Sequence, residues 1–133
     1  MFNRNIETEL KKWKTSSIRK PLIIRGARQV GKTSVVRKFG TENFSQIIEI
    51  NLEKKDQFSI FNKANSVEDF LKRISVFFDE PAVPGNTLLF IDEIQESKNV
   101  MELLRFFSEE KPQLHIIAAG SLPEAKIDKS WSR

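Results

Sequence analysis

An eight-residue motif, Gly-Ala-Arg-Gln-Val-Gly-Lys-Thr at residues 26–33, limits the architectures open to this chain. The apolar run at residues 22–24 precedes it and predicts a buried strand, and residues 33–39 after it have the pattern of a helix. A glycine-containing loop between a strand and a helix that ends in Lys-Thr is typical of a phosphate-binding loop. A similar turn that binds nothing is the alternative. The sequence thus predicts a strand–loop–helix unit of an α/β fold.

Each residue type in this motif has a physical reason. Gly26 and Gly31 have no Cβ and can take positive φ, so the backbone N–H groups can surround a phosphate. The helix that begins near Gly31 adds the positive end of its dipole. We expect Lys32 to reach the β- and γ-phosphates and the Thr33 hydroxyl to bind Mg²⁺. The residues predicted to hold the nucleotide are Gly26, Ala27, Arg28, Gln29, Val30, Gly31, Lys32, Thr33 and Ser34.

Two acids follow a second buried strand. Residues 87–91 form a continuous apolar run, which is typical of a strand buried on both faces, and Asp92 and Glu93 come directly after it. Open α/β sheets bind ligands at the carboxyl ends of their strands. We therefore expect Asp92 to hold Mg²⁺, directly or through water, and Glu93 to orient and deprotonate an attacking water. The alternative is that both acids merely cap the next helix.

A third strand, predicted at residues 114–119, leads to Gly120 and Ser121. By the same edge argument, the Ser121 hydroxyl reaches the γ-phosphate region, although serine after glycine is also ordinary turn chemistry. The predicted catalytic residues are therefore Lys32, Glu93 and Ser121, and the predicted metal ligands are Thr33 and Asp92. His115, the single histidine, is expected to be structural.

The remaining elements follow from periodicity. An amphipathic helix at residues 5–14 is expected to lie either beside the adenine or simply in the core, and Trp13 is expected in the core. Gly40 is expected to end the loop helix, with a turn at residues 41–43. A strand at 46–52 and helices at 67–78 and 98–110 follow, whereas residues 56–62 are ambiguous.

Composition sets outer limits. The 133 residues form one expected domain, with its core at residues 21–122 and a tail at 123–133 that has no clear periodicity. Cysteine is absent, no apolar run is long enough to span a membrane, and the N-terminus is too polar for a signal peptide, so a cytoplasmic location is expected. Of the 22 Lys and Arg residues, 11 lie in residues 1–40 with only 2 of the 18 acids, which keeps nucleic-acid contact as an alternative.

The segments RGARQVGKTS at 25–34, LLFIDEIQ at 88–95 and HIIAAGS at 115–121 together resemble a family of bacterial and archaeal AAA+-type ATPases. In that family the nucleotide domain precedes an uncharacterised C-terminal domain. The resemblance implies a Walker A motif at residues 26–33, a Walker B motif at Asp92 and Glu93, a sensor 1 residue at Ser121, and ATP and Mg²⁺ as cofactors. Family members continue with a further strand, a helical lid and another domain, so we expect this chain to be truncated, without its lid.

From these observations we expect a three-layer P-loop NTPase fold, AAA+-like, with a parallel sheet covered by helices on both faces. The expected activity is ATP hydrolysis with Glu93 as the base. The alternatives are a nucleotide-dependent switch or scaffold with negligible turnover and a small-molecule kinase. No arginine finger is identifiable, so hydrolysis is expected to be weak without a protein partner. An exposed edge of the strand at 116–119 and its neighbour is expected to cause self-association.

Overall fold

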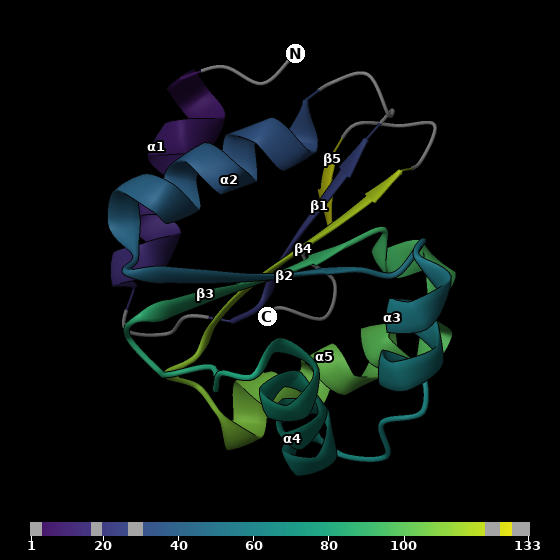
Figure 1. The fold of residues 1–133 in the computed structure, drawn as a ribbon. Helices are drawn as coiled ribbons and strands as arrows, with labels where there is room; N and C mark the ends of the chain where they lie inside the picture. Colours follow the sequence, from purple (N-terminus) through teal and green to yellow (C-terminus); the bar gives the residue numbers. More distant parts are fainter. Residues whose placement is uncertain (1–3, 17–19, 27–30, 122–125, 129–133) are drawn as a thin grey trace.

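A five-stranded sheet forms the middle layer of the molecule (Figure 1). The computed structural model describes residues 4–16, 20–26, 31–121 and 126–128. The strand order is β2-β3-β4-β1-β5; the first four strands are parallel, and β5 is antiparallel to β1. The strands are β1 Leu22–Gly26, β2 Gln46–Asn51, β3 Thr87–Asp92, β4 His115–Ser121 and β5 Lys126–Asp128.

Helices cover both faces of this sheet. One layer holds α1 (Arg4–Thr15) and α2 (Lys32–Asn43), and the opposite layer holds α3 (Lys55–Phe61), α4 (Val67–Phe78) and α5 (Lys98–Glu110) (Figure 1). A short 3-10 helix, η2 (Ile94–Glu96), follows β3. The prediction of a three-layer α/β fold with a parallel sheet is confirmed. Within the described residues, no helix combines the length and the apolar character that crossing a membrane requires.

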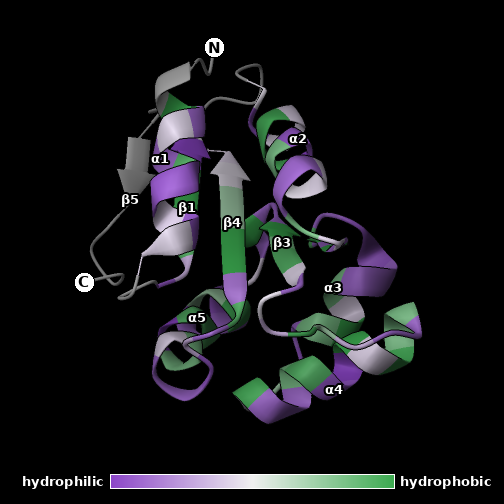
Figure 2. Cartoon of the chain, turned by 90° about the vertical axis from the view of Figure 1, so that its left-hand side faces the viewer, coloured by the Kyte–Doolittle hydropathy of each residue, from purple (hydrophilic) through white to green (hydrophobic). Residues whose placement is uncertain are grey.

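The core is divided into two halves by the sheet. Successive side chains of a strand point to opposite faces, so Phe90 packs with α1 and α2, whereas Ile91 packs with the helices of the other layer. All six residues of β3 are buried, and hydrophobic residues dominate β3 and β4 (Figure 2). Helices cover both faces of this strand, which explains the unbroken apolar run at residues 88–91 between the buried polar residues Thr87 and Asp92.

Gly40 does not end the loop helix, and the predicted turn at residues 41–43 is wrong. The helix α2 continues to Asn43, and the N–H of Phe44 donates to the Gly40 carbonyl. Gly40 is buried, and a Cβ at this position would lie 2.5 Å from Cδ1 of Ile47 on β2. Glycine is needed here because the helix approaches the sheet closely, and not because the chain turns.

The end of the chain also differs from expectation. No element was expected after Leu122, but β5 pairs with β1, with Ile24 opposite Ile127. Three residues are too few to show a periodicity, yet they can satisfy the backbone N–H and C=O groups at the edge of β1. Because β4 lies between β3 and β1, the expected exposed edge at residues 116–119 is wrong as well. The expectation of self-association rested on this exposed edge, so it has no support from the described strands.

The helix α1 is anchored to the sheet layer by aromatic packing. The Trp13 ring lies 5.4 Å from the His115 ring and 6.5 Å from the Phe39 ring, measured between centroids. Trp13 Nε1 donates to the Lys20 carbonyl at 2.6 Å. These contacts give Trp13 and His115 packing roles. Residues 17–19 lie outside the described residues, so the placement of this region beside an adenine stays a prediction.

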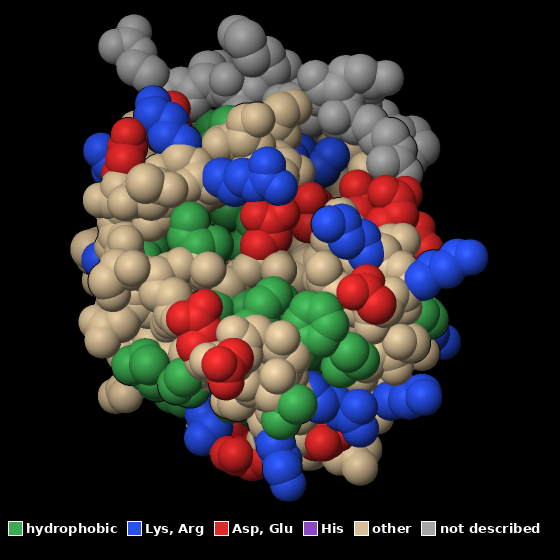
Figure 3. All heavy atoms as spheres, in the orientation of Figure 1, with side chains coloured by type: hydrophobic (Ala, Val, Ile, Leu, Met, Phe, Trp, Pro, Cys, Tyr) green, Lys and Arg blue, Asp and Glu red, His purple; other side chains and the backbone are tan. Residues whose placement is uncertain are grey.

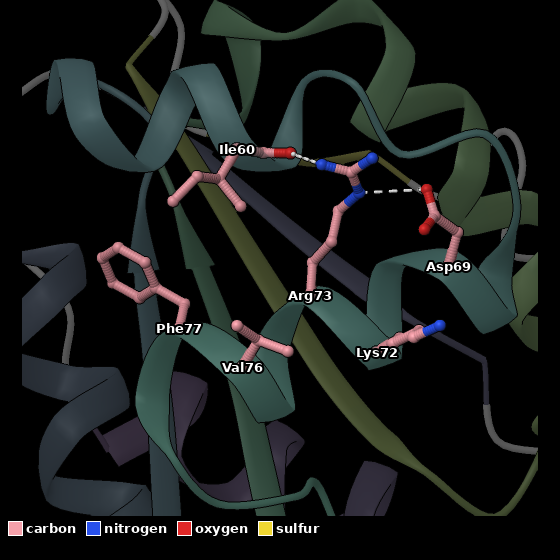
Figure 4. Close-up of a pocket in the computed structure, with 6 residues that line it drawn as sticks. All are labelled: Ile60, Asp69, Lys72, Arg73, Val76 and Phe77. Carbon is pink, nitrogen blue, oxygen red and sulfur yellow. Dashed lines mark hydrogen bonds and ion pairs between the residues drawn. The ribbon is translucent and has the colours of Figure 1, made fainter.

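The first turn of α4 is tied to α3 by one arginine. The Ser66 hydroxyl accepts from the Asp69 N–H, as expected of an N-cap. Arg73 Nε donates to Asp69 Oδ2 at 3.0 Å, and Arg73 Nη1 donates to the Ile60 carbonyl at 3.0 Å (Figure 4). The contacts surround a cavity of about 560 Å³ lined by Ile60, Asp69, Lys72, Arg73, Val76 and Phe77. The Arg73–Asp69 pair at this cavity is therefore engaged in joining two helices.

Replacing Asp69 by Asn should lower the midpoint of thermal unfolding near neutral pH. The Arg73 hydrogen bond, followed by the Asn65 N–H, lowers the pKa of Asp69. A carboxyl group whose pKa is lowered by folding stabilises the fold above its ordinary pKa, and this contribution is lost as the pH falls through the lowered value. The difference between the variant and the parent should therefore shrink as the pH falls below about 4, which circular dichroism melts at several pH values would measure.

Glu68→Gln is the matched control, because it removes the same charge from the same helical turn. Glu68 has a side-chain exposure of 73% and pairs with Lys111 at 2.9 Å. Exposed pairs contribute little, so this variant should melt close to the parent. If both variants lower the midpoint of thermal unfolding equally, the effect comes from the helix dipole and not from the Arg73 contact.

Candidate functional site

The register of the sheet brings the predicted site residues to one edge. Gly26 at the end of β1 lies opposite Ser121 at the end of β4, and Asn51 at the end of β2 lies opposite Asp92 at the end of β3. Parallel strands share the same direction, so their carboxyl ends gather at a single edge of the sheet. The loop that follows β1 begins at this edge.

A cavity of about 230 Å³ opens there. Its described lining consists of Gly31, Lys32, Thr33, Ser34, Asp92, Glu93 and Ser121. The three predicted catalytic residues and both predicted metal ligands therefore surround one space. Ala27, Arg28, Gln29 and Val30 lie outside the described residues, and their contact with a nucleotide stays a prediction.

The start of α2 has the backbone geometry of an anion site. Gly31, the N-cap residue, has φ 74° and ψ 27°, a left-handed conformation that glycine adopts without strain. The first N–H groups of a helix have no intrahelical acceptor, and in α2 they belong to residues beside the cavity.

Lys32 carries the positive charge of the cavity wall. The residue is only 5% exposed, and its Nζ donates to the Gly26 carbonyl at 3.2 Å. This contact holds the ammonium group at the end of β1. A buried cation at the N-terminal end of a helix favours an anion in the cavity.

Thr33 and Asp92 form the polar pair at the floor of the site. Thr33 Oγ1 donates to Asp92 Oδ2 at 2.9 Å, and the Glu93 N–H donates to Asp92 Oδ1 at 2.9 Å. Burial raises the pKa of Asp92, and these two hydrogen bonds oppose that rise. Asp92 is thus a buried carboxyl group whose two oxygens both have defined donors.

This pair fits Mg²⁺. Adjacent ligands of an octahedral Mg²⁺ lie about 2.9 Å apart, which matches the separation of the Thr33 and Asp92 oxygens. Among the described residues, no group of three or more His, Cys, Asp or Glu side chains could hold a metal. Mg²⁺ typically takes one or two protein oxygens and completes its shell with phosphates and water, so two protein ligands suffice.

Glu93 has an unusual backbone. Its φ of 55° and ψ of 48° are left-handed, and it precedes η2 as the N-cap residue. Few non-glycine residues take this conformation, and among the described residues the other one is Asp79, which ends α4 as its C-cap. The turn places the Glu93 carboxylate against the end of β4, where Glu93 Oε1 lies 3.4 Å from the Ser121 hydroxyl, which donates to it.

Sequence reasoning missed one residue next to the site. Gln95 Nε2 donates to Glu93 Oε1 at 2.8 Å, and Gln95 Oε1 accepts from the Ser121 N–H at 3.2 Å. No spacing rule connects Gln95 with a residue 26 positions away. The one sequence signal that could have pointed to Gln95 is its position two residues after Glu93.

A charged pair joins α2 to β2. Arg37 Nε and Nη2 donate to the two carboxylate oxygens of Glu49 at 2.8 and 2.7 Å, and the Glu49 hydrogen bond raises the pKa of Arg37. Arg37 is therefore engaged with β2 and not directed at the cavity.

On the face drawn in Figure 3, basic and acidic side chains are intermixed, which does not favour a nucleic-acid interface on that face.

Comparison with known proteins gives two findings. Residues 18–130 match the sequence model of a family described as AAA domain. The Replication factor C large subunit of Methanosphaera stadtmanae is 32% identical over 89 residues, which is 67% of this chain and 15% of that protein. The chain thus spans a small part of the length of this relative. The family match includes every described residue that lines the cavity.

Proposed function

The chain belongs to the AAA domain family. From this premise we propose that its cavity binds Mg²⁺–ATP and that the domain hydrolyses ATP with Glu93 as the general base. Membership of this family identifies the chain as an AAA+-like ATPase domain. The observation that carries the finer proposal is the Thr33–Asp92 hydrogen bond beside the buried Lys32, because it joins the start of α2 to the end of β3 within one cavity.

Binding would use charge and backbone together. Lys32 would exchange its contact with the Gly26 carbonyl for the β- and γ-phosphates, which offer stronger, charge-assisted hydrogen bonds. The N–H groups at the start of α2 would face the β-phosphate. Thr33 and Asp92 would hold Mg²⁺, which when bound neutralises part of the phosphate charge.

Hydrolysis requires a water molecule directed at the γ-phosphate. Glu93 would accept a proton from this water while the water oxygen bonds to the γ-phosphorus. The bond between the γ-phosphorus and the bridging oxygen breaks at the same time, and ADP leaves with that oxygen. Lys32 would offset the charge that develops on the departing ADP. The Ser121 hydroxyl, on the same cavity wall, would contact the γ-phosphate or the water.

A switch with very slow turnover is the second candidate, and one observation favours it. Among the described residues that line the cavity, Lys32 is the one cation. Efficient phosphoryl transfer in this class uses an arginine that is often supplied by a partner. We therefore propose that a second copy of this chain or another protein completes the site. The name of the relative describes a subunit, which supports an assembly.

Replacing Thr33 by Val tests the metal and nucleotide parts together. The parent should bind ATP more tightly with Mg²⁺ than with a chelator, because the metal links the phosphates to Thr33 and Asp92. Thr33→Val removes the hydroxyl and keeps the shape, so the gain from Mg²⁺ should largely disappear while binding in chelator persists. Isothermal titration calorimetry with ATP in both buffers measures the two affinities.

Thr41→Val is the control for this experiment, since Thr41 is exposed on the same helix and far along it from the cavity. It should behave as the parent does. If the parent binds no ATP in either buffer, or if Mg²⁺ strengthens binding equally in Thr33→Val, the proposed site is wrong.

A further inference from the structure

The Gln95 carboxamide joins two strand ends beside the cavity. Its N–H donates to Glu93 Oε1 at 2.8 Å and its oxygen accepts from the Ser121 N–H at 3.2 Å. Glu93 follows β3 and Ser121 ends β4, so one side chain connects both. We name these contacts the Gln95 bridge. Gln95 itself is not among the described residues that line the cavity.

We propose that Gln95 is a positioning residue, which holds the Glu93 carboxylate toward the γ-phosphate by way of the Ser121 backbone. The proposal rests on the proposed function in one respect, namely that Glu93 is the base. The bridge itself is a structural claim about the chain without nucleotide.

The surroundings of Gln95 support a fixed orientation. A Cβ on Gly120 would lie 2.9 Å from Gln95 Oε1 and 3.1 Å from Cγ2 of Ile94. The space that this glycine leaves is therefore the space that the carboxamide occupies. The two residues that precede Gln95 are also fixed in place: Ile94 is buried, and Glu93 has a defined left-handed backbone.

Fixing the carboxylate matters because glutamate has three side-chain torsions. A general base must stay within hydrogen-bond reach of the proton it removes, and a displacement of about 1 Å can slow a reaction by roughly 10²-fold. The Gln95 bridge restricts Glu93 through one oxygen. Loss of the bridge would leave the base in place but remove one of the contacts that orient it, so the rate falls and nucleotide affinity does not.

Gln95→Leu tests the catalytic part, because leucine has a similar size and cannot bridge. The expected result is a fall in kcat of about tenfold, with the Kd for Mg²⁺–ATP unchanged within about twofold. In the Glu93→Gln background, the same substitution should have no further effect, because there is no base left to position. A merely structural lesion would lower the rate in both backgrounds.

Gln57→Leu is the matched control. Gln57 Oε1 accepts from the Asn51 N–H at 2.8 Å, so this glutamine also braces the end of a strand, but it does not contact Glu93. Its replacement should leave kcat unchanged. Gly120→Ala is the second test variant: it keeps Gln95 but forces the carboxamide to move, and it should lower kcat as Gln95→Leu does.

Hydrogen exchange tests the bridge without nucleotide. The Ser121 amide should exchange at least about tenfold faster in Gln95→Leu than in the parent, and at the parent rate in Gln57→Leu. NMR exchange at single amides measures this. Unchanged exchange at Ser121 would overturn the bridge, and an unchanged kcat in both Gln95→Leu and Gly120→Ala would overturn the positioning role.

The two proposals can fail separately. A parent that binds no ATP contradicts the proposed function, while the exchange rates still decide whether the bridge exists. A parent that binds ATP without any single-turnover hydrolysis contradicts both the base role of Glu93 and the positioning role of Gln95, and leaves nucleotide binding supported.

Discussion

Glu93→Gln should slow ATP hydrolysis by roughly 10²–10⁴-fold and leave ATP affinity nearly unchanged. Glutamine keeps the size of the side chain and can still contact Gln95 and Ser121, but it cannot accept a proton from water. Asp92 and Thr33, which would hold Mg²⁺, are untouched. Because turnover by this chain alone is expected to be slow, the rate is best measured as single-turnover phosphate release over hours, with calorimetry for the affinity.

Glu96→Gln is the control for this variant, since Glu96 is an exposed acid of the same 3-10 helix and does not line the cavity. It removes an equal charge at nearly the same place and should hydrolyse ATP as the parent does. Equal rates in Glu93→Gln and the parent would remove Glu93 from the mechanism and favour the switch.

Lys32→Ala should weaken Mg²⁺–ATP binding by at least about tenfold. Lys32 is a buried cation facing the cavity, and a hydrogen bond to a charged group contributes about 1.5–3 kcal/mol. Since 1.4 kcal/mol corresponds to a factor of ten, the expected loss is about tenfold to more than a hundredfold. Calorimetric titration with Mg²⁺–ATP measures it, after a thermal melt has established that the variant folds.

Lys38→Ala removes the same charge from the same helix. Lys38 has a side-chain exposure of 60% and pairs with Glu7 at 3.6 Å. If net charge alone attracted ATP, both variants would lose affinity alike, and more so at low salt. If the phosphates contact Lys32, the affinity of Lys38→Ala stays near that of the parent. Unchanged affinity in a folded Lys32→Ala variant would reject the phosphate-loop assignment.

Long periodic segments could be predicted because their pattern is local. The helix α5 spans residues 98–110 as the sequence indicates, and the Ser66 N-cap begins α4. In each case the apolar spacing and the cap residue lie within one or two turns of each other. The parallel sheet could be predicted for a similar reason, since buried strands alternate with helical segments.

Gly40 shows where local reasoning fails. A glycine near the end of a helical pattern usually marks a C-terminus, but here the deciding contact is with Ile47 on the sheet. That contact depends on how α2 packs, which no local pattern contains. The strand β5 is a comparable case, because three residues form a strand only by pairing with β1.

The candidate site was foreseen as a set of residues and not as a network. The motif and the two acids indicate Lys32, Thr33, Asp92 and Glu93, and the edge argument adds Ser121. The link between them was not predictable, because Gln95 reaches Ser121 only once β3 and β4 lie side by side. Side-chain amides have no spacing rule of their own, so such links appear only in three dimensions.

The left-handed backbone at Glu93 has an energetic cost for the folded chain. A non-glycine residue in this conformation costs of order 1–3 kcal/mol, and glycine or asparagine would lower that cost. Selection for thermal stability alone would therefore replace this residue. A redesign guided by stability alone would therefore favour glycine or asparagine at position 93, and it would remove the carboxylate that we propose as the base.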